Sequence, residues 1–332
     1  MWQARCLVET EMSAMTSARR DTVAVVLEEP RRLVLRGMSL PEPGDDDVVV
    51  DVEWSGISTG TERLLWSGLM PAFPGMGYPL VPGYESVGRV SEAGTNASRR
   101  VGDRVFVPGA KCFGDVRGLF GGSASRLVVS ADRARSFDED IGEMGVLFAL
   151  AATAYHVSSA PGAMQPDLII GHGTLGRLLA RIAVLKGDQP PVVWEKNPVR
   201  ATGAEGYAVI DPATDTRRDY RCICDVSGDA KILDSLVPRL APGGEIVLAG
   251  FYSDQLSFSF PPAFMREARF RVAAEWRPAD FDAVRTLVES GKLSLDGLIT
   301  HRSEANLAAS AYQTAFEDIS CLKMILDWRG YQ

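Results

Sequence analysis

The stretch that decides the fold is Asp167–Glu195, DLIIGHGTLGRLLARIAVLKGDQPPVVWE. It opens with the apolar run 168–170, which predicts a buried parallel strand. A glycine-rich turn at 171–176 follows, and then a helical pattern of leucine and isoleucine that Gly187 is placed to end. A second apolar run, 192–194, precedes the terminal glutamate. This order of strand, turn, helix and strand predicts a βαβ unit.

The turn has the G-x-G-x-x-G spacing that is typical of dinucleotide binding. Gly171 permits the tight turn, Gly173 lets the backbone approach a pyrophosphate, and Gly176 lets helix and strand pack closely. The start of the helix offers free N–H groups and a partial positive charge to that phosphate. The alternative is a purely structural turn without a ligand. The predicted cofactor-binding residues are Gly171, Gly173, Thr174, Leu175, Gly176, Glu195, Ser227 and Gly250.

Glu195 indicates which dinucleotide binds. It lies about 20 residues past the glycines, where a carboxylate accepts hydrogen bonds from a ribose diol. The same carboxylate would repel a 2′-phosphate, so we expect NAD rather than NADP. Lys196 and Arg200 follow closely and are able to pair with a phosphate, which leaves NADP as the alternative.

The composition is that of an ordinary globular protein of 332 residues, with 46% hydrophobic and 23% charged residues. The net charge of −8 provides no attraction to nucleic acid. The absence of an apolar run of about 18 residues predicts no integral membrane segment. Five scattered cysteines favour a reducing compartment, and we expect a cytoplasmic protein. Cys222 and Cys224, two apart in a strand-like run, are expected to be core residues.

The chain divides into a β-rich part and an alternating part. Short strand-like runs between glycines and prolines fill 22–136 and predict a partly closed β barrel. The pattern turns helical at Ile141, and strands then alternate with helices, which predicts a doubly wound parallel sheet. Finer predictions there are a helix at 229–240, a break at 242–244, and strands at 245–250 and 270–276.

From Leu293 the chain is expected to return to the β-rich part, with a helix near 305–316 and a last strand at 323–326. We therefore expect an α/β protein of two domains. The predicted ranges are a disordered extension at 1–20, the β-rich domain at 21–145 and 293–332, and a Rossmann dinucleotide-binding domain at 146–292.

Several blocks resemble the medium-chain dehydrogenase/reductase superfamily, whose β-rich catalytic domain is GroES-like. They are VPGYESVGRV, GDRVFVPG, GHGTLGRLLA, CDVSG, LAPGGEIVLAG and CLKMIL. Four longer blocks, WSGISTGTERLLWSG, FPGMGYPLVPGYESVG, FPPAFMREAR and SLDGLITHR, resemble one family within it, the 3-hydroxyethyl (bacterio)chlorophyllide dehydrogenases of the bacteriochlorophyll pathway. This resemblance implies NAD-dependent oxidation of a 3-(1-hydroxyethyl) group on a tetrapyrrole to an acetyl group.

The departures from the zinc-containing members of the superfamily predict an enzyme without a metal. Those members carry a cysteine where this chain has Ser58 and a histidine where it has Tyr84. The region of their third ligand, 147–152, is apolar here, and Cys112 stands alone where four cysteines hold a structural zinc. Serine and tyrosine oxygens stay protonated at neutral pH and are poor zinc ligands.

Without a metal, the carbinol proton needs a side chain or a positioned water. Tyr84 is a candidate to bond the substrate oxygen, Ser58, Thr59 and Thr61 form a candidate hydroxyl relay, and Glu85 is a candidate buried base. The alternative for Tyr84 is plain packing. The alternative for the serine and the threonines is capping of a strand end, and that for Glu85 is a supporting role behind the site. His156 is a further catalytic candidate, with a core role as its alternative; His172 and His301 are weaker ones.

A flat apolar substrate needs a wide apolar cleft. Candidate walls are Trp54, Trp66, Met70, Phe73, Met76 and Tyr78, and also Phe251, Tyr252, Phe258, Phe260 and Phe264. Candidate cations for a substrate carboxylate are Arg63, Lys111, Arg117 and Arg266. A homodimer is expected. Two other functions stay open: a zinc-free quinone or enoyl reductase that uses NADPH, and a nucleotide-binding protein without catalysis.

Overall fold

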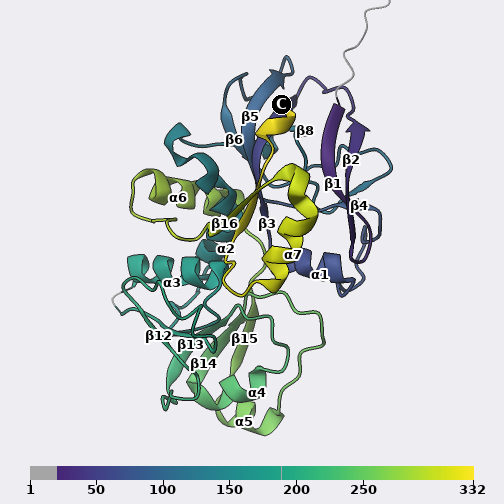
Figure 1. Cartoon of the computed structure of the whole chain (residues 1–332). Coiled ribbons are helices and arrows are strands. Elements are labelled where there is room, and N and C mark those ends of the chain that lie inside the picture. Colours follow the sequence, from purple (N-terminus) through teal and green to yellow (C-terminus); the bar gives the residue numbers. More distant parts are fainter. Residues whose placement is uncertain (1–20, 188) are drawn as a thin grey trace, which may run out of the picture.

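The computed structural model describes residues 21–187 and 189–332, so the predicted extension at 1–20 lies outside the described residues. Three sheets organise these residues (Figure 1). Two of them belong to the β-rich part of the chain and the third is entirely parallel.

The β-rich part is built around β3 (Asp47–Ile57), whose valines are buried on both faces of the sheet. A seven-stranded sheet has the order β16-β17-β3-β5-β6-β9, with β8 also paired to β3, and a four-stranded sheet has the order β2-β1-β4-β7. The other strands are β1 (Asp21–Glu29), β2 (Arg32–Ser39), β4 (Leu80–Val81), β5 (Ser86–Ala93), β6 (Arg104–Val107), β7 (Arg117–Gly118), β8 (Arg126–Ser130), β9 (Arg135–Ser136), β16 (His301–Glu304) and β17 (Met324–Asp327).

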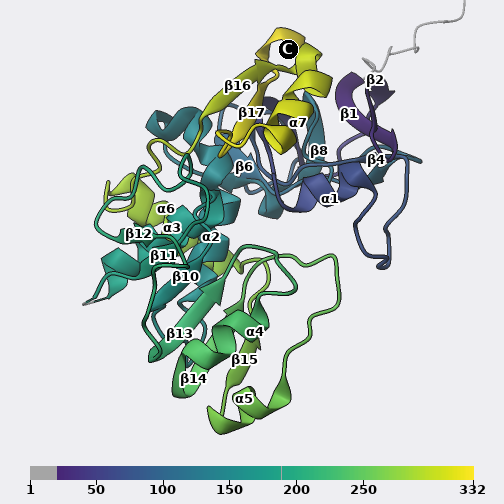
Figure 2. The ribbon, with the colours of Figure 1, turned by 60° about the horizontal axis from the view of Figure 1, so that its bottom comes forward.

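The carboxyl-terminal segment returns to the β-rich part, as predicted. β17 pairs antiparallel with β3, with Met324 opposite Ile57. Helix α7 (Ala308–Glu317) buries Tyr312 and Phe316 in the same core as the β3 valines. Both views show this yellow segment beside the purple and blue strands, away from the green end of the parallel sheet (Figures 1 and 2).

The parallel sheet has six strands in the order β12-β11-β10-β13-β14-β15, which is the predicted doubly wound arrangement. Its first βαβ unit is the stretch quoted above: β10 (Leu168–Ile170), α3 (Thr174–Lys186) and β11 (Val192–Trp194). The remaining strands are β12 (Ala208–Ile210), β13 (Tyr220–Asp225), β14 (Leu240–Leu248) and β15 (Arg269–Val272). Cys222 and Cys224 are buried in this core, as predicted.

Seven helices are described within 21–187 and 189–332; those not yet named are α1 (Thr61–Ser67), α2 (Phe148–Val157), α4 (Leu233–Leu236), α5 (Phe260–Met265) and α6 (Pro278–Glu289). Short 3-10 turns are η1 (Ala131–Arg133), η2 (Glu139–Leu147), η3 (Val237–Arg239), η4 (Ala305–Leu307) and η5 (Arg329–Tyr331). None of the helices in the described ranges combines the length and apolarity needed to cross a bilayer.

Three local predictions are wrong. The helix expected at 229–240 is only α4 followed by a 3-10 turn, because Pro238 has no N–H to continue the helical bonding. The break expected at 242–244 lies inside β14, which begins at Leu240. The strand expected at 270–276 ends at Val272, opposite the last residue of β14, and Glu275 has a positive φ of 52° that extended chain does not adopt.

Candidate active site

A cleft of about 2090 Å³ runs between the carboxyl ends of the parallel strands and the β-rich part. On the first side it is lined by the glycine turn 171–176, Glu195 after β11, and Ser227 and Gly250 after β13 and β14. On the other side it is lined by residues 58–61 and Tyr84. Ligands of open parallel sheets bind at this edge, where the strand order reverses. All eight predicted cofactor-binding residues line the cleft.

The glycine turn has the geometry that a bound dinucleotide requires. Gly171 has a φ of 101°, which favours glycine. A Cβ at Gly176 would lie 1.9 Å from the Gly171 carbonyl oxygen, so no side chain fits there. A Cβ at Gly173 would meet no heavy atom within 4 Å, so this backbone is open to a close approach from the cleft. These positions and the N-terminus of α3 fit a pyrophosphate.

The loop after β11 holds Glu195 in a defined orientation. Its Oε2 accepts the N–H of His172 at 3.1 Å, and its Oε1 accepts the N–H of Asn197 at 2.8 Å. Each carboxylate oxygen has a second lone pair, so both can still accept a ribose hydroxyl. Arg177, which sequence analysis did not single out, braces this loop by donating to the carbonyls of His172, Arg200, Thr202 and Gly203.

His172 is part of this brace. Its Nδ1 lies 2.6 Å from the Arg200 carbonyl and its Nε2 lies 2.7 Å from the Tyr207 hydroxyl. Burial lowers the pKa of His172 to about 4. The ring is therefore neutral at physiological pH and both nitrogens are occupied, so it holds the turn in place.

Two hydroxyl groups lie at the positions where the superfamily resemblance places the zinc ligands of other members. Tyr84 donates a hydrogen bond of 2.6 Å to Ser58 Oγ, and we call these two residues the hydroxyl pair. Thr59 and Thr61 line the same wall of the cleft. Burial raises the pKa of Tyr84, and nearby Glu85 and Glu62 raise it further. Tyr84 therefore stays protonated and acts as a hydrogen-bond donor.

Two buried carboxylates lie behind the hydroxyl pair. Glu85 forms an ion pair of 2.6 Å with Lys323, and both side chains are almost completely buried. Burial raises the pKa of Glu85 while the Lys323 ammonium opposes that rise. Glu62 accepts the N–H of Ser58 at 3.0 Å and the hydroxyl of Tyr312 at 2.6 Å.

Sequence analysis missed Lys323, Glu62 and Tyr312. The signal for Lys323 is a charge inside the apolar run CLKMIL. The other two lie 250 residues apart, and no local pattern connects them.

Several predicted site residues are not brought to the cleft. His156 is absent from its lining and instead places Nδ1 2.8 Å from Asp280 Oδ2. His301 lies against Thr300 and Asp318, also outside the lining. Of the predicted walls, only Phe251 and Tyr252 line the cleft. The cluster from Trp54 to Tyr78 does not. Met70 is buried in a separate core that also packs Trp66, Met76 and Tyr78. Trp54 packs against another core, and Phe73 is exposed outside the lining.

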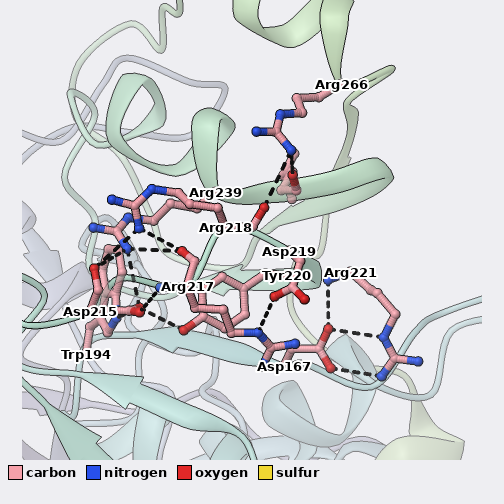
Figure 3. Close-up of polar contacts among 11 residues, drawn as sticks. Asp167, Trp194, Asp215, Arg217, Arg218, Asp219, Tyr220, Arg221, Arg239 and Arg266 are labelled. Carbon is pink, nitrogen blue, oxygen red and sulfur yellow. Dashed lines mark hydrogen bonds and ion pairs between the residues drawn. The ribbon is translucent and has the colours of Figure 1, made fainter.

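The predicted cations divide in the same way. Arg63 and Lys111 line the cleft, together with Arg133, which was not predicted. Arg117 does not line it and donates to the Tyr78 carbonyl instead. Arg266 is also absent from the lining and donates to the Arg218 carbonyl (Figure 3). It also donates to the carbonyls of Pro238 and Leu240.

Within the described ranges, no group of three histidine, cysteine, aspartate or glutamate residues is placed to hold a metal ion. The oxygens at the two zinc-ligand positions are hydroxyls already bonded to each other. Cys112 is buried, and burial raises the pKa of its thiol to about 11, so it stays a thiol at neutral pH. The donor set does not fit a catalytic zinc.

Comparisons with known proteins agree with this architecture. Residues 44–137 match the alcohol dehydrogenase GroES-like domain. An alcohol dehydrogenase of Escherichia coli CFT073 in complex with NADH has a TM-score of 0.79 at 22% identity, over 93% of this chain and 99% of its own. A dehydrogenase of Sinorhizobium meliloti bound to NADP has a TM-score of 0.77 at 21% identity, over 92% and 99%. At these identities the likeness shows the fold.

Two curated relatives are much more similar. The 2-desacetyl-2-hydroxyethyl bacteriochlorophyllide A dehydrogenase of Rhodobacter capsulatus is 58% identical over 93% of this chain and 99% of its own length. Its namesake in Cereibacter sphaeroides is 59% identical over the same shares.

The GroES-like part, the parallel sheet and the cleft between them define a medium-chain dehydrogenase of the alcohol dehydrogenase type. The chain belongs to the family of 2-desacetyl-2-hydroxyethyl bacteriochlorophyllide A dehydrogenases. The predicted resemblance is confirmed.

Proposed function

We propose that the chain oxidises the 3-(1-hydroxyethyl) group of a (bacterio)chlorophyllide to a 3-acetyl group and transfers the hydride to NAD without a metal ion. The observation that carries this proposal is the identity of 58–59% over nearly the whole chain to dehydrogenases named for that substrate. The hydroxyl pair supports it, because it stands on the wall of the cleft opposite the glycine turn.

The size of the cleft supports a bulky substrate beside a dinucleotide. Sites for drug-sized ligands occupy roughly 300–1,000 Å³. The cleft of about 2090 Å³ exceeds that range. The lining of the cleft includes the apolar residues Pro41, Pro108, Ala110, Phe120, Val128, Val129, Leu150 and Trp276. Arg63, Lys111 and Arg133 are cleft cations of the β-rich part that are available to a substrate carboxylate.

The reaction removes a hydride from the carbinol carbon and a proton from its oxygen, and leaves a ketone conjugated with the macrocycle. NAD, when bound, accepts the hydride at its nicotinamide ring. Because Tyr84 donates to Ser58 Oγ, the Ser58 hydroxyl retains one lone pair to accept the carbinol proton and one hydrogen to pass along a relay. We assign the proton to a relay through Ser58, Thr59 and Thr61 that ends in water in the cleft.

Tyr84 orients Ser58 for this transfer, because it donates to Ser58 Oγ at 2.6 Å. Tyr84 does not itself take the proton, because its raised pKa keeps it a donor over the whole physiological range. Glu85 is proposed as a support for this arrangement and not as the base, since it is paired with Lys323 and does not line the cleft.

We propose NAD over NADP. Glu195 places a carboxylate where a 2′-phosphate would lie, and its two backbone hydrogen bonds prevent it from turning away. Of the cations near that position, Arg200 and Arg239 already have other partners, while Lys196 lines the cleft. Arg200 donates to the Ile319 carbonyl, and Arg239 stacks on Trp194 and donates to the Asp215 carbonyl (Figure 3).

We also propose a cytoplasmic homodimer. The four described cysteines are buried free thiols, which fits a reducing compartment.

Strand β15 is the last in its sheet, so one row of its backbone groups is unpaired within the sheet. Phe260, Phe264 and Met265 on the neighbouring α5 are 66–75% exposed. A second copy paired along β15 would cover both features. Phe264→Glu is then expected to give monomers in sedimentation velocity. Leu69→Glu, which changes an exposed residue elsewhere, is the control and should leave the dimer intact.

The test is incubation of the protein with NAD and a 3-hydroxyethyl chlorophyllide. The acetyl product extends the conjugation, so the long-wavelength absorption band should shift to the red as NADH appears. Tight NAD binding without turnover would favour a non-catalytic protein. Preference for NADPH with turnover of simple quinones would favour a reductase. Either outcome would overturn the proposal.

A further inference from the structure

The second buried carboxylate, Glu62, has no role in the reaction as described above. It is fully buried and does not line the cleft, although the residues on both sides of it do. Burying a charged group is costly unless it is paired or hydrogen-bonded. No cation is within salt-bridge distance of Glu62 among the residues that the structure describes. This position therefore needs an explanation beyond packing.

The contacts of Glu62 lead directly to the hydroxyl pair. Its Oε1 accepts the N–H of Ser58 at 3.0 Å, while its own N–H donates to the Ser58 carbonyl at 3.2 Å. These reciprocal bonds close residues 58–62 into a fixed turn. Ser58 Oγ then projects to Tyr84, from which it accepts a bond of 2.6 Å. Any movement of Glu62 moves the backbone that carries one member of the hydroxyl pair.

The carboxyl-terminal helix holds the other side of Glu62. Tyr312 on α7 donates to Glu62 Oε2 at 2.6 Å, and its oxygen also lies 3.3 Å from Ser123 Oγ. Tyr312 is completely buried, so this bond is shielded from water. A buried contact between segments 250 residues apart thus ends, through Glu62, at the substrate wall of the cleft.

We propose that Glu62 is the positioning residue for the hydroxyl pair, and that its ionised form, held by Tyr312, fixes Ser58 for the reaction. The proposal rests on the function proposed above. Both of its contacts are donors to a carboxylate, so the ionised form is satisfied completely. On protonation, the Oε2–H would have to donate to the Tyr312 oxygen, and the Tyr312 hydroxyl would turn toward Ser123. The bond that fixes Ser58 is then no longer charge-assisted, and it weakens.

The groups around Glu62 decide the pH at which this happens. Burial raises the pKa of Glu62 to about 7, opposed chiefly by the hydrogen bonds from Tyr312 and Ser58. Glu85 raises it further and Lys323 lowers it. The negative charge of Glu62 in turn raises the pKa of Tyr84, which helps to keep that hydroxyl a donor.

The experiment measures kcat for the hydroxyethyl chlorophyllide with saturating NAD from pH 5.5 to 9. The wild type should lose activity below about pH 7, where Glu62 becomes protonated. Glu62→Gln should remove that acid limb and lower the plateau by about 10- to 100-fold, the cost of a small misplacement of a reacting group. Tyr312→Phe should move the limb to higher pH, because the lost hydrogen bond favoured the ionised form.

Tyr220→Phe is the matched control. Tyr220 is also a buried phenol bonded to a carboxylate, at 2.7 Å from Asp215, and it lies in the parallel sheet and does not line the cleft (Figure 3). Its pH profile should match that of the wild type. An unchanged acid limb in Glu62→Gln, or an equal displacement in Tyr220→Phe, would overturn the positioning role. A wild type with no turnover at any pH would instead overturn the proposed function.

Discussion

Replacement of Glu62 by glutamine has a predictable effect on stability as well as on activity. Glutamine is a neutral analogue of the protonated acid, because its oxygen can accept the Ser58 N–H and its amide can donate to Tyr312. The wild-type carboxyl has a pKa of about 7 in the folded state against an ordinary value of 4.5. Between these values the folded chain holds a proton at Glu62 that the unfolded chain has released.

The sign follows from this difference in bound protons. Because the native state binds more protons, the free energy of unfolding falls as the pH rises from about 4.5 to about 7. A tenfold change in proton affinity corresponds to about 1.4 kcal/mol, so the total loss is about 3 kcal/mol. Glu62→Gln does not titrate there. It should therefore gain about 3 kcal/mol over the wild type between pH 4.5 and pH 8, while it loses activity.

Urea unfolding at several pH values measures this gain, since the groups that do not interact with Glu62 titrate alike in both proteins and cancel in the difference. Glu304→Gln, the same substitution on an exposed strand residue, is the control and should give a flat difference. Parallel stability curves for the wild type and Glu62→Gln would show that Glu62 does not titrate near neutrality. That result would remove the physical basis for the positioning role.

Three further predictions concern the rest of the site. Glu195→Gln keeps an acceptor oxygen but removes the charge, so its preference for NAD over NADP should be smaller than that of the wild type. Glu195→Ala should in addition raise the KM for NAD. A wild type that uses both cofactors equally contradicts the assignment. Tyr84→Phe should lower kcat by about 10²-fold, and an unchanged kcat in this variant rules out the role of Tyr84 as a donor. The wild type should keep its kcat up to pH 10, since the pKa of Tyr84 is raised above that value. Lys323→Met should lower the free energy of unfolding in urea by about 3–5 kcal/mol, because it leaves Glu85 buried without its partner. The double variant with Glu85→Gln should recover most of this loss. Equal stability of the single and double variants speaks against the ion pair.

The parallel-sheet half was predictable because its signals are local. The strand, turn and helix of 168–186 follow one another in sequence, and glycine spacing reports backbone geometry directly. Glu195 is found by counting along the chain. The failures in the same half have local causes that the pattern hid: Pro238 stops helical bonding inside an apolar periodicity, and the length of β15 is set by its neighbour β14.

The candidate site was predictable only where superfamily resemblance supplied the positions. Ser58 and Tyr84 are 26 residues apart. Ser58 directly follows β3 and Tyr84 lies two residues before β5, so the pairing of these two strands brings them together. The aromatic cluster at 66–78 was assigned to the substrate because glycine and proline suggested an exposed loop. Phe73 is exposed there, but Trp66, Met70, Met76 and Tyr78 pack into a small core of their own around Leu65 and Leu80. Composition does not distinguish a cleft wall from such a core.

Of the two buried carboxylates behind the hydroxyl pair, Glu85 is paired with a cation in the described part of the chain and Glu62 is not. Lys323 neutralises Glu85, so the net charge at this point changes with Glu62, from neutral below about pH 7 to negative above it. Lys323 lowers the pKa of Glu62 and Glu85 raises it. Lys323→Met should therefore displace the acid limb of kcat to higher pH even though Lys323 does not contact Glu62, and adding Glu85→Gln should bring the limb back. Displacement without recovery would mean that the limb reports structural damage and not the charge beneath Ser58.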